Sequence, residues 1–361
     1  MKRRLIILNN IQFNQANPNQ APVAAIQHNL SSIRPTAPEI GYLWSSYLAE
    51  SMSVCMLKYI VAKAKDPDYK PIFQQALDVS SQRLNSMETI FNSLSHPIPV
   101  AFGEKDVNTN AKELYSESFL LTYTKLTNEY ILQHYCQAYS LATRTDIRDC
   151  FSKCIDTARD IHQKASDVLL AKGLLQKPPS IATPEKPDFV NSKNYYGSSI
   201  FESKRPLNAL EISYIFDDIN SKLIIETLNL GFRQVVKDEK IKDYLIRGNK
   251  ITDKQAGVLG DILEGEDLPV PKTYDYEVTT SEESPFSDRL ILTHYTIVLA
   301  YTILGYGFAL TNSARKDLVT TFTRLISELL TFSKDGTDLL IEHNWLERPP
   351  ETANRPELVV H

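Results

Sequence analysis

Apolar residues recur along this chain at steps of three and four, the spacing that places side chains on one face of an α-helix. The pattern is clear in one segment near the N-terminus and in another after the midpoint. The first stripe consists of Trp44, Tyr47, Leu48, Met52, Cys55, Met56, Tyr59 and Ile60. The second consists of Ile212, Ile215, Phe216, Ile219, Leu223 and Leu230. Both segments are therefore predicted to form amphipathic helices.

Three further helical segments are predicted to follow each of these, over 69–95, 109–143 and 146–175 in the first half and over 239–264, 285–312 and 314–345 in the second. Between the second and third helices the chain contains Pro99 in the first half and Pro269 and Pro271 in the second. Because proline lacks a backbone donor and clashes inside a helix, these residues mark a longer connection. Four long helices with one longer connection are typical of a four-helix bundle.

The two sets of helices carry related sequences, which indicates a tandem duplication. The string EIGYLW from Glu39 recurs as EISYIF from Glu211, and Asp66 recurs as Asp238. Later landmarks follow in the same order: 98–100 with 268–270, 143–149 with 311–317, and 173–179 with 344–350. The offset stays near 170 residues, so the chain is predicted to be an all-α protein made of two copies of one bundle.

The predicted organisation has five parts. These are a leader over 1–36, a first bundle over 37–177, a linker over 178–207, a second bundle over 208–350 and a tail over 351–361. The leader is rich in Asn, Gln and Pro and is expected to be poorly ordered. Its short apolar run of four residues is too short for the hydrophobic region of a signal peptide.

One predicted helix, 290–312, contains no Asp, Glu, Lys or Arg and is long enough to cross a bilayer. The corresponding stretch of the first copy carries Lys125, Glu129 and His134. Two copies of one domain are expected to share one environment. The apolar stretch is therefore predicted to be a helix buried on most sides, and no membrane span is expected.

Composition and charge exclude several classes of protein. The chain has 361 residues, is 42% hydrophobic and 23% charged, and carries a net charge of −5, which is typical of a globular protein. It lacks the basic excess that phosphate binding needs, so no nucleic-acid partner is expected. Its cysteines match no zinc-ligand spacing and are expected to be free thiols in a reducing cytosol; they are Cys55, Cys136, Cys150 and Cys154.

Two four-helix bundles raise the hypothesis of a dinuclear metal site of the ferritin-like type, in which facing helices supply Glu and Glu-x-x-His ligands. The sequence argues against it. The residues three positions before the seven histidines are Ala25, Ser93, Ile131, Arg159, Ile291, Leu340 and Leu358, and none is acidic. No metal site and no cofactor are therefore predicted.

Single polar residues on the apolar faces are further candidates. Glu226 lies on the second stripe, where a buried carboxylate needs a partner or a raised pKa. Its counterpart is Val54, which favours a satisfied or edge-exposed carboxylate over a catalytic one. His134 and His294 lie in the third helices at non-equivalent positions, and hydrogen-bonded core or interface histidines are favoured over metal ligands.

Cys150 and Cys154 lie one helical turn apart and, with His162, are a candidate for a soft-metal site. The alignment of the copies places Leu318 and Phe322 at the cysteine positions, which favours an apolar core.

Two charged pairs recur in both copies, Arg148–Asp149 beside Thr145 and Lys316–Asp317 beside Ser313. Helix N-caps at the threonine and the serine explain them best, with a shared polar binding feature as the alternative. No Gly-x-Gly-x-x-Gly, Walker, Gly-x-Ser-x-Gly or His-Glu-x-x-His motif occurs, so no catalytic residue is predicted.

Six strings in order carry a family resemblance: EIGYLWSSYLAESMSVCMLKY, PIPVAFGEKDVNTNA, GLLQKPP, KRPLNALEISYIF, ESPFSDRL and NWLERPP. From about residue 37 to its end, the chain resembles a family of spore-forming Firmicutes, domain of unknown function number three thousand two hundred and thirty-one. The resemblance implies a tandem ferritin-like bundle. Some relatives are labelled as spore coat proteins without an assay, and no catalytic residues come with the family.

These observations favour a non-enzymatic structural or protein-interaction role linked to sporulation or the spore coat. The alternative is a small-molecule-binding protein or a metal-dependent enzyme with its site between the two bundles. Eighteen tyrosines and two tryptophans favour aromatic contacts between helices or with a protein partner. The expected location is the cytoplasm of a bacterium, with an association to the spore.

Overall fold

The computed structural model describes residues 30, 33–197 and 205–352. The predicted leader over 1–36 lies almost wholly outside the described residues, as does most of the tail over 351–361. The described residues from Thr36 onwards belong to one compact unit. Within the described part, the regular structure consists of eight α-helices and three short 3₁₀ helices, which confirms the all-α prediction.

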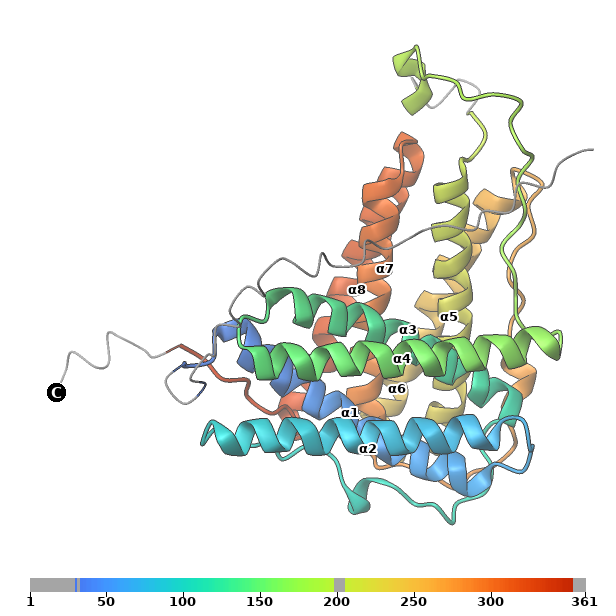
Figure 1. Ribbon diagram of the computed structural model, residues 1–361. Helices are drawn as coiled ribbons and strands as arrows, with labels where there is room; N and C mark the ends of the chain where they lie inside the picture. Colours follow the sequence, from blue (N-terminus) through green and yellow to red (C-terminus); the bar gives the residue numbers. More distant parts are fainter. Residues whose placement is uncertain (1–29, 31–32, 198–204, 353–361) are drawn as a thin grey trace, which may run out of the picture. The chain divides into compact units, whose positions relative to one another are not determined.

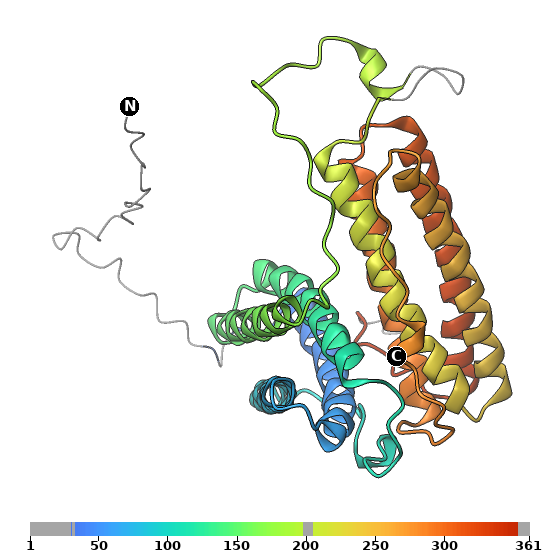
Figure 2. The ribbon, with the colours of Figure 1, turned by 90° about the vertical axis from the view of Figure 1, so that its right-hand side faces the viewer.

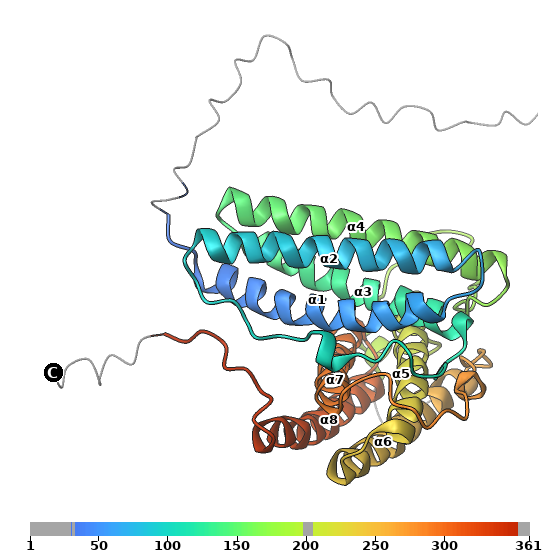
Figure 3. The same ribbon diagram turned by 90° about the horizontal axis from the view of Figure 1, so that it is seen from below.

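The first bundle consists of α1 (Ala37–Lys63), α2 (Lys70–Ser93), α3 (Glu117–Leu141) and α4 (Thr145–Ala171). Figure 2 shows α2 close to end-on, and Figure 3 shows the helices of this bundle lengthwise, side by side. The third helix begins at Glu117 rather than near residue 109, because the Ser116 side chain caps it by accepting a hydrogen bond from the Phe119 N–H at 3.1 Å. The preceding residues belong to the long connection between α2 and α3.

The second bundle repeats this order with α5 (Ala209–Val235), α6 (Glu239–Glu264), α7 (Asp288–Asn312) and α8 (Lys316–Glu342) (Figure 1). The starts of its helices match those of the first bundle. Thr36 with Glu39 forms a capping box at α1, and Asn208 with Glu211 forms one at α5. The repeated strings found in the sequence therefore mark equivalent helix starts, and the tandem duplication is confirmed.

The apolar helix α7 is long and apolar enough to cross a membrane by length and composition, and 50% of its most apolar window is buried. Leu290, Leu299 and Tyr306 lie in the core of the second bundle, each at most 3% exposed. That the chain has no membrane span stays a prediction.

The long connections between the second and third helices of each bundle reach across to the other bundle. Asp106, at the end of η2 (Glu104–Asp106), accepts a hydrogen bond at 2.7 Å from the hydroxyl of Ser287, the cap of α7. Glu277, at the end of η4 (Asp275–Glu277), accepts one from the hydroxyl of Ser116, the cap of α3. Because the two contacts repeat each other at an offset of 171 residues, a pseudo-two-fold axis relates the bundles.

Helices α3 and α7 meet on this axis. The Tyr123 hydroxyl lies 2.5 Å from Nε2 of His294. Tyr130 stacks on Tyr301, with ring centroids 4.7 Å apart and an interplanar angle of 3°. The two residues of each pair are 171 positions apart, so each residue contacts its own counterpart in the other copy. Such contacts are typical of an isologous interface between two identical subunits.

The segments that follow α4 and α8 also contact the opposite bundle. Gln176 donates a hydrogen bond to the Lys272 carbonyl at 2.8 Å and accepts one from the Lys272 N–H at 2.6 Å. Its counterpart Glu347 accepts hydrogen bonds from the N–H groups of Val100 and Ala101, at 2.8 and 2.6 Å. The repeated strings GLLQKPP and NWLERPP thus carry the residues that tie each bundle to the connection of the other.

Candidate functional site

The strings EIGYLW and EISYIF begin with a glutamate that anchors the turn between the last two helices of its bundle. Glu39 is 1% exposed and accepts hydrogen bonds from the N–H groups of Thr143 and Arg144, both at 2.7 Å. Burial alone would raise its pKa, but these backbone donors outweigh burial and lower the pKa of Glu39 to about 2. The carboxylate therefore stays charged and holds α1 to the start of α4.

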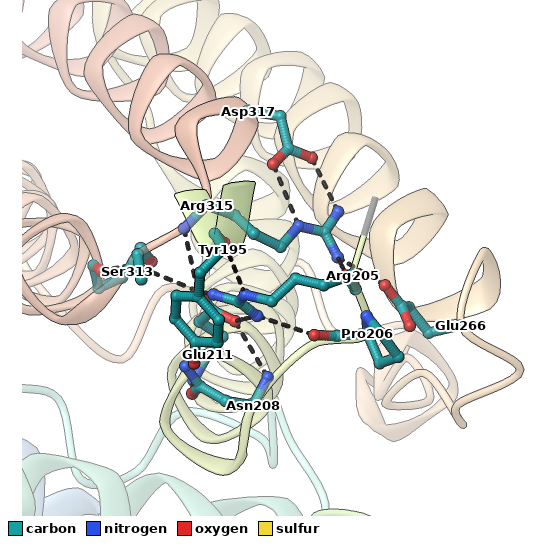
Figure 4. Close-up of polar contacts among 11 residues, drawn as sticks. Tyr195, Arg205, Pro206, Asn208, Glu211, Glu266, Ser313, Arg315 and Asp317 are labelled. Atoms are coloured by element: carbon teal, nitrogen blue, oxygen red, sulfur yellow. Dashed lines mark hydrogen bonds and ion pairs between the residues drawn. The ribbon is translucent and has the colours of Figure 1, made fainter. Parts of the chain in front are cut away.

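Figure 4 shows the corresponding anchor in the second bundle. Glu211 accepts hydrogen bonds from the N–H groups of Ala314 and Arg315 at 3.0 and 3.2 Å. Arg205 adds a bidentate contact, with both terminal nitrogens 2.8 Å from the carboxylate oxygens. Its guanidinium also lies 4.1 Å from the ring centroid of Tyr195. These contacts give both repeated glutamates a structural role.

The predicted helix caps at Thr145 and Ser313 are wrong. Helices α4 and α8 follow Arg144 and Arg315, whose side chains do not cap them. Each arginine pairs instead with the carboxylate two residues later, at 2.8 Å in both Arg144–Asp146 and Arg315–Asp317.

Equivalent residues at this turn are therefore 171 positions apart. The predicted alignment, which matched Arg148–Asp149 to Lys316–Asp317, was displaced by one helical turn.

The centre of the first bundle contains a buried polar layer to which each helix contributes one side chain. Glu50 of α1, 1% exposed, accepts hydrogen bonds from Nη1 of Arg83 at 3.0 Å and from the hydroxyl of Tyr135. Arg83 also donates to the Cys154 carbonyl at 3.2 Å and to the Thr157 hydroxyl at 2.8 Å. The layer is a buried ion pair whose members bond to one another.

The equivalent layer of the second bundle consists of Lys222, Gln255, Tyr306 and Glu328. Gln255 accepts a hydrogen bond from the Tyr306 hydroxyl at 3.1 Å and donates one to Glu328 at 2.9 Å. Lys222 is 2% exposed, and its ammonium lies 5.1 Å from the Tyr306 ring centroid. Burial lowers the pKa of Lys222 to about 8 against the opposing effect of nearby carboxylates.

Next to these layers a second pair of positions differs between the copies. In the first bundle the Ser46 hydroxyl lies 3.0 Å from Nε2 of His134, and burial lowers the pKa of His134 to about 4. The counterparts are Asp218 and Gly305. A Cβ added to Gly305 would lie 2.7 Å from Oδ1 of Asp218, so the carboxylate reaches into the space that a side chain would need. Burial raises the pKa of Asp218, and its Oδ2 has no hydrogen-bond partner.

Glu226 lies one helical turn beyond Lys222 on α5 and is 7% exposed. Burial, together with hydrogen bonding to the carboxyl of Asp253, raises the pKa of Glu226 to about 9. At neutral pH this carboxyl is therefore protonated. Its partner is a second carboxyl, and its counterpart Val54 has no such group.

The other candidate residues do not come together as one site. Cys150 and Cys154 are both buried and face a shallow groove of about 490 Å³ between α2 and α4. His162 lies away from them, with Nε2 4.0 Å from Glu129. His294 contacts Tyr123 at the pseudo-two-fold axis, as an interface histidine would. Within the described ranges, no three His, Cys, Asp or Glu residues are placed to hold a metal ion.

One groove between the bundles combines space, an apolar lining and several charged side chains. It has a volume of about 560 Å³, within the usual range for small-molecule sites. Helices α3 and α4 form one wall, α5 forms the other, and the segment after α4 and Tyr274 contribute to its edge. Its Lys, Glu, His and Asp side chains are Lys125, Glu129, His162 and Asp217.

Neither central layer was predicted from the sequence, although the two copies have polar residues at matching positions of these helices. Glu50, Arg83 and Tyr135 fall on otherwise apolar helix faces, and so do Lys222, Gln255 and Tyr306 at the same offsets. A polar residue in both copies at one core position indicates a shared layer even when its charge differs.

Comparison with known proteins identifies the family to which this chain belongs. Among curated proteins, none matches the chain. A solved structure described as a "putative spore coat protein" from Bacillus halodurans C-125 is 15% identical, with a TM-score of 0.38, and the match covers 42% of this chain and 98% of that one. The model of the family described as Protein of unknown function (DUF3231) matches residues 28–186 and again 196–358. The chain therefore belongs to this family and contains its domain twice.

Proposed function

We propose that this protein has a non-enzymatic structural or protein-interaction role, in the sporulation or spore-coat setting that the family resemblance implies. The observation that supports the structural part is the reciprocal exchange between the bundles. The long connection of each bundle accepts a hydrogen bond from the serine that caps a helix of the opposite bundle, Asp106 from Ser287 and Glu277 from Ser116.

The polar groups at the bundle centres support the same proposal. In the first bundle Arg83 and Tyr135 both donate to Glu50, and in the second Tyr306 and Glu328 both bond to Gln255. These hydrogen bonds join side chains of different helices inside the core, where they position the helices.

Localisation of the tagged full-length chain in sporulating cells of the bacterium that encodes it tests the proposal. We expect the protein to collect at the developing spore and to remain with purified spores. A Glu277→Ala variant, which removes the carboxylate that accepts a hydrogen bond from the capping Ser116 of α3, is expected to weaken this retention. Glu282→Ala, at an exposed position in the same connection, serves as the matched control. Uniform distribution of the native chain in sporulating cells would contradict the proposal.

Metal analysis separates this role from the metal-dependent alternative. Protein purified without chelator is expected to contain less than one equivalent of iron, manganese or zinc. A full equivalent of bound metal would reverse the ranking of the two functions. The groove between the bundles is the observation that favours the second candidate, small-molecule binding.

A further inference from the structure

The groove between the bundles breaks the symmetry that the rest of the interface obeys. Its Lys, Glu, His and Asp side chains are Lys125 and Glu129 on α3, His162 on α4 and Asp217 on α5. Their pseudo-two-fold counterparts are Thr296, Ala300, Ser333 and Ser45, none of which carries a charge. The duplicated scaffold alone therefore does not require these four residues.

The charges in the groove are not balanced. Lys125 pairs with Glu129 at 3.1 Å, and Glu129 lies 4.0 Å from the ring of His162. Burial lowers the pKa of His162 and the neighbouring Lys125 lowers it further, against the opposing effect of Glu129, so the uncharged ring is favoured. One cation then faces the two carboxylates of Glu129 and Asp217, which leaves a net negative charge when both are ionised.

Asp217 is the carboxylate without a cation of its own. Among the described residues, no Lys, Arg or His forms an ion pair with it. Its side chain is open to solvent at the groove, but the protein around it and the charge of Glu129 raise its pKa to about 6, against the effect of Lys125. A positive group placed beside Asp217 would be stabilised by both carboxylates.

The rest of the groove is mainly apolar. Leucines from α3 and α4, together with Phe216 and Ile224 of α5, line it. An apolar body with a cationic end therefore fits the lining better than a sugar or a free ion does. An anion would meet two carboxylates, and its only attractive partner, Lys125, is already paired.

We propose that this groove binds a small organic amine, with the ammonium group beside Asp217 and Glu129 and the apolar part against Leu126 and Phe216. The proposal adds a ligand site to the structural role above and does not depend on it. The ordinary basicity of aliphatic amines keeps such a ligand charged at neutral pH.

Calorimetric titration of the full-length chain with three probes of equal apolar body tests the proposal. The probes are 4-phenylbutylamine, 4-phenylbutanol and 5-phenylpentanoate, each with a phenyl ring on a chain of four methylene groups. We expect the amine to bind at one site per chain, about tenfold more tightly than the alcohol, because only the ammonium group is attracted to the two carboxylates. A tenfold difference in affinity corresponds to about 1.4 kcal/mol. The carboxylate probe is expected to bind most weakly.

Two variants locate the site. Asp217→Asn is expected to weaken amine binding about tenfold and to leave binding of the alcohol unchanged, while Asp261→Asn, on an exposed part of α6, is the matched control. Leu174→Trp, which places a larger side chain in the groove, should abolish binding of both probes. Absence of saturable amine binding, equal affinity for all three probes, or unchanged amine affinity in Asp217→Asn would each overturn the proposal.

Discussion

The two bundles share one backbone plan but use different chemistry at their centres. The first contains an ion pair, with Glu50 accepting hydrogen bonds from Arg83 and Tyr135. The second replaces the glutamate by Lys222 and the arginine by Gln255, and it keeps the tyrosine as Tyr306. What the two copies share is one polar side chain per helix at the same level, whatever its charge.

This difference shows what the fold requires at its centre. A buried ion pair and a buried lysine beside an amide carry different costs, because an unpaired charge in the core loses its hydration. Both layers keep a tyrosine on the third helix that hydrogen-bonds to a partner on the first or second. We infer that the position of the polar layer sets the register of the helices, while the sign of its charge is free to vary.

Separating the bundles gives the largest expected effect. A fragment ending at residue 190 keeps the first bundle. It loses the hydrogen bond from the capping Ser116 to Glu277 and the contact of Tyr123 with His294. We expect a helical circular-dichroism spectrum and a melting temperature lower by roughly 10 °C or more. The lost contacts are worth several kcal/mol, and each kcal/mol lowers the melting temperature by a few degrees.

The full chain cleaved once by protease in the exposed stretch 180–190 is the control. It retains every contact between the bundles and should melt near the intact chain. If the fragment melted with the intact chain, the interface would contribute little.

Replacement of the middle side chain of each layer compares the layers directly. Arg83→Leu leaves the Glu50 carboxylate buried without its cation and is expected to lower the free energy of unfolding by about 3–5 kcal/mol. Gln255→Leu removes the hydrogen bonds to Tyr306 and Glu328, but Glu328 keeps its ion pair with Lys254, so the loss should be about 1–3 kcal/mol. Denaturant titration followed by circular dichroism measures both. Equal losses would mean that the charge of the first layer has no energetic consequence.

Glu226 should make the stability of the second bundle depend on pH. Its folded pKa of about 9 lies above the ordinary 4.5, so the folded chain holds a proton that the unfolded chain releases between these values. Stability contributed by this carboxyl is full below pH 4.5 and falls as the pH rises through the window. Glu226→Gln is expected to remove this slope and to stabilise the protein at pH 8 by about 1–3 kcal/mol.

Unfolding titrations of this variant at pH 5 and pH 8 provide the measurement. Glu264→Gln, at an exposed position of α6, is the control that should leave the slope unchanged. A pH dependence that survives in Glu226→Gln would assign the slope to other groups, including the buried Asp218.

Two glycines of α7 give the smallest expected difference. Gly307 has open space around it, so Gly307→Ala should stabilise the helix by about 0.5–1 kcal/mol. Gly305→Ala places its Cβ 2.7 Å from Oδ1 of Asp218 and should lose that gain or become destabilising. Melting temperatures of the two variants test the pair. A gain at both positions would show that Asp218 moves away without cost.

The sequence was sufficient to predict the architecture because the structural anchors are repeated as recognisable strings. Glu39 and Glu211 begin such strings, and Gln176 and Glu347 lie within the strings near the ends of the copies. The prediction failed where the strings diverge. The turn at Arg144 and Arg315 was aligned three residues out of register, which displaced the helix caps and the cysteine comparison.

The central layers and the groove could not be predicted from spacing alone. Glu50 and Lys222 are opposite in charge, so no pattern of identical residues connects them. The groove combines Glu129 of α3 with Asp217 of α5, residues distant in sequence that approach only after the bundles dock. Helical periodicity predicts which residues share one helix face, but it does not specify which faces of two bundles meet.

The hydrogen bonds between the capping serines and the opposite bundle also have a consequence during translation. Ser116 receives its partner Glu277 from a residue 161 positions later in the chain. At synthesis rates of about 5–20 residues per second, Ser116 is synthesised roughly ten to thirty seconds before Glu277. During this interval the nascent first bundle exposes the face of α3 with Tyr123 and Tyr130, which later contacts the second bundle. A chaperone that shields this face would act only on that intermediate.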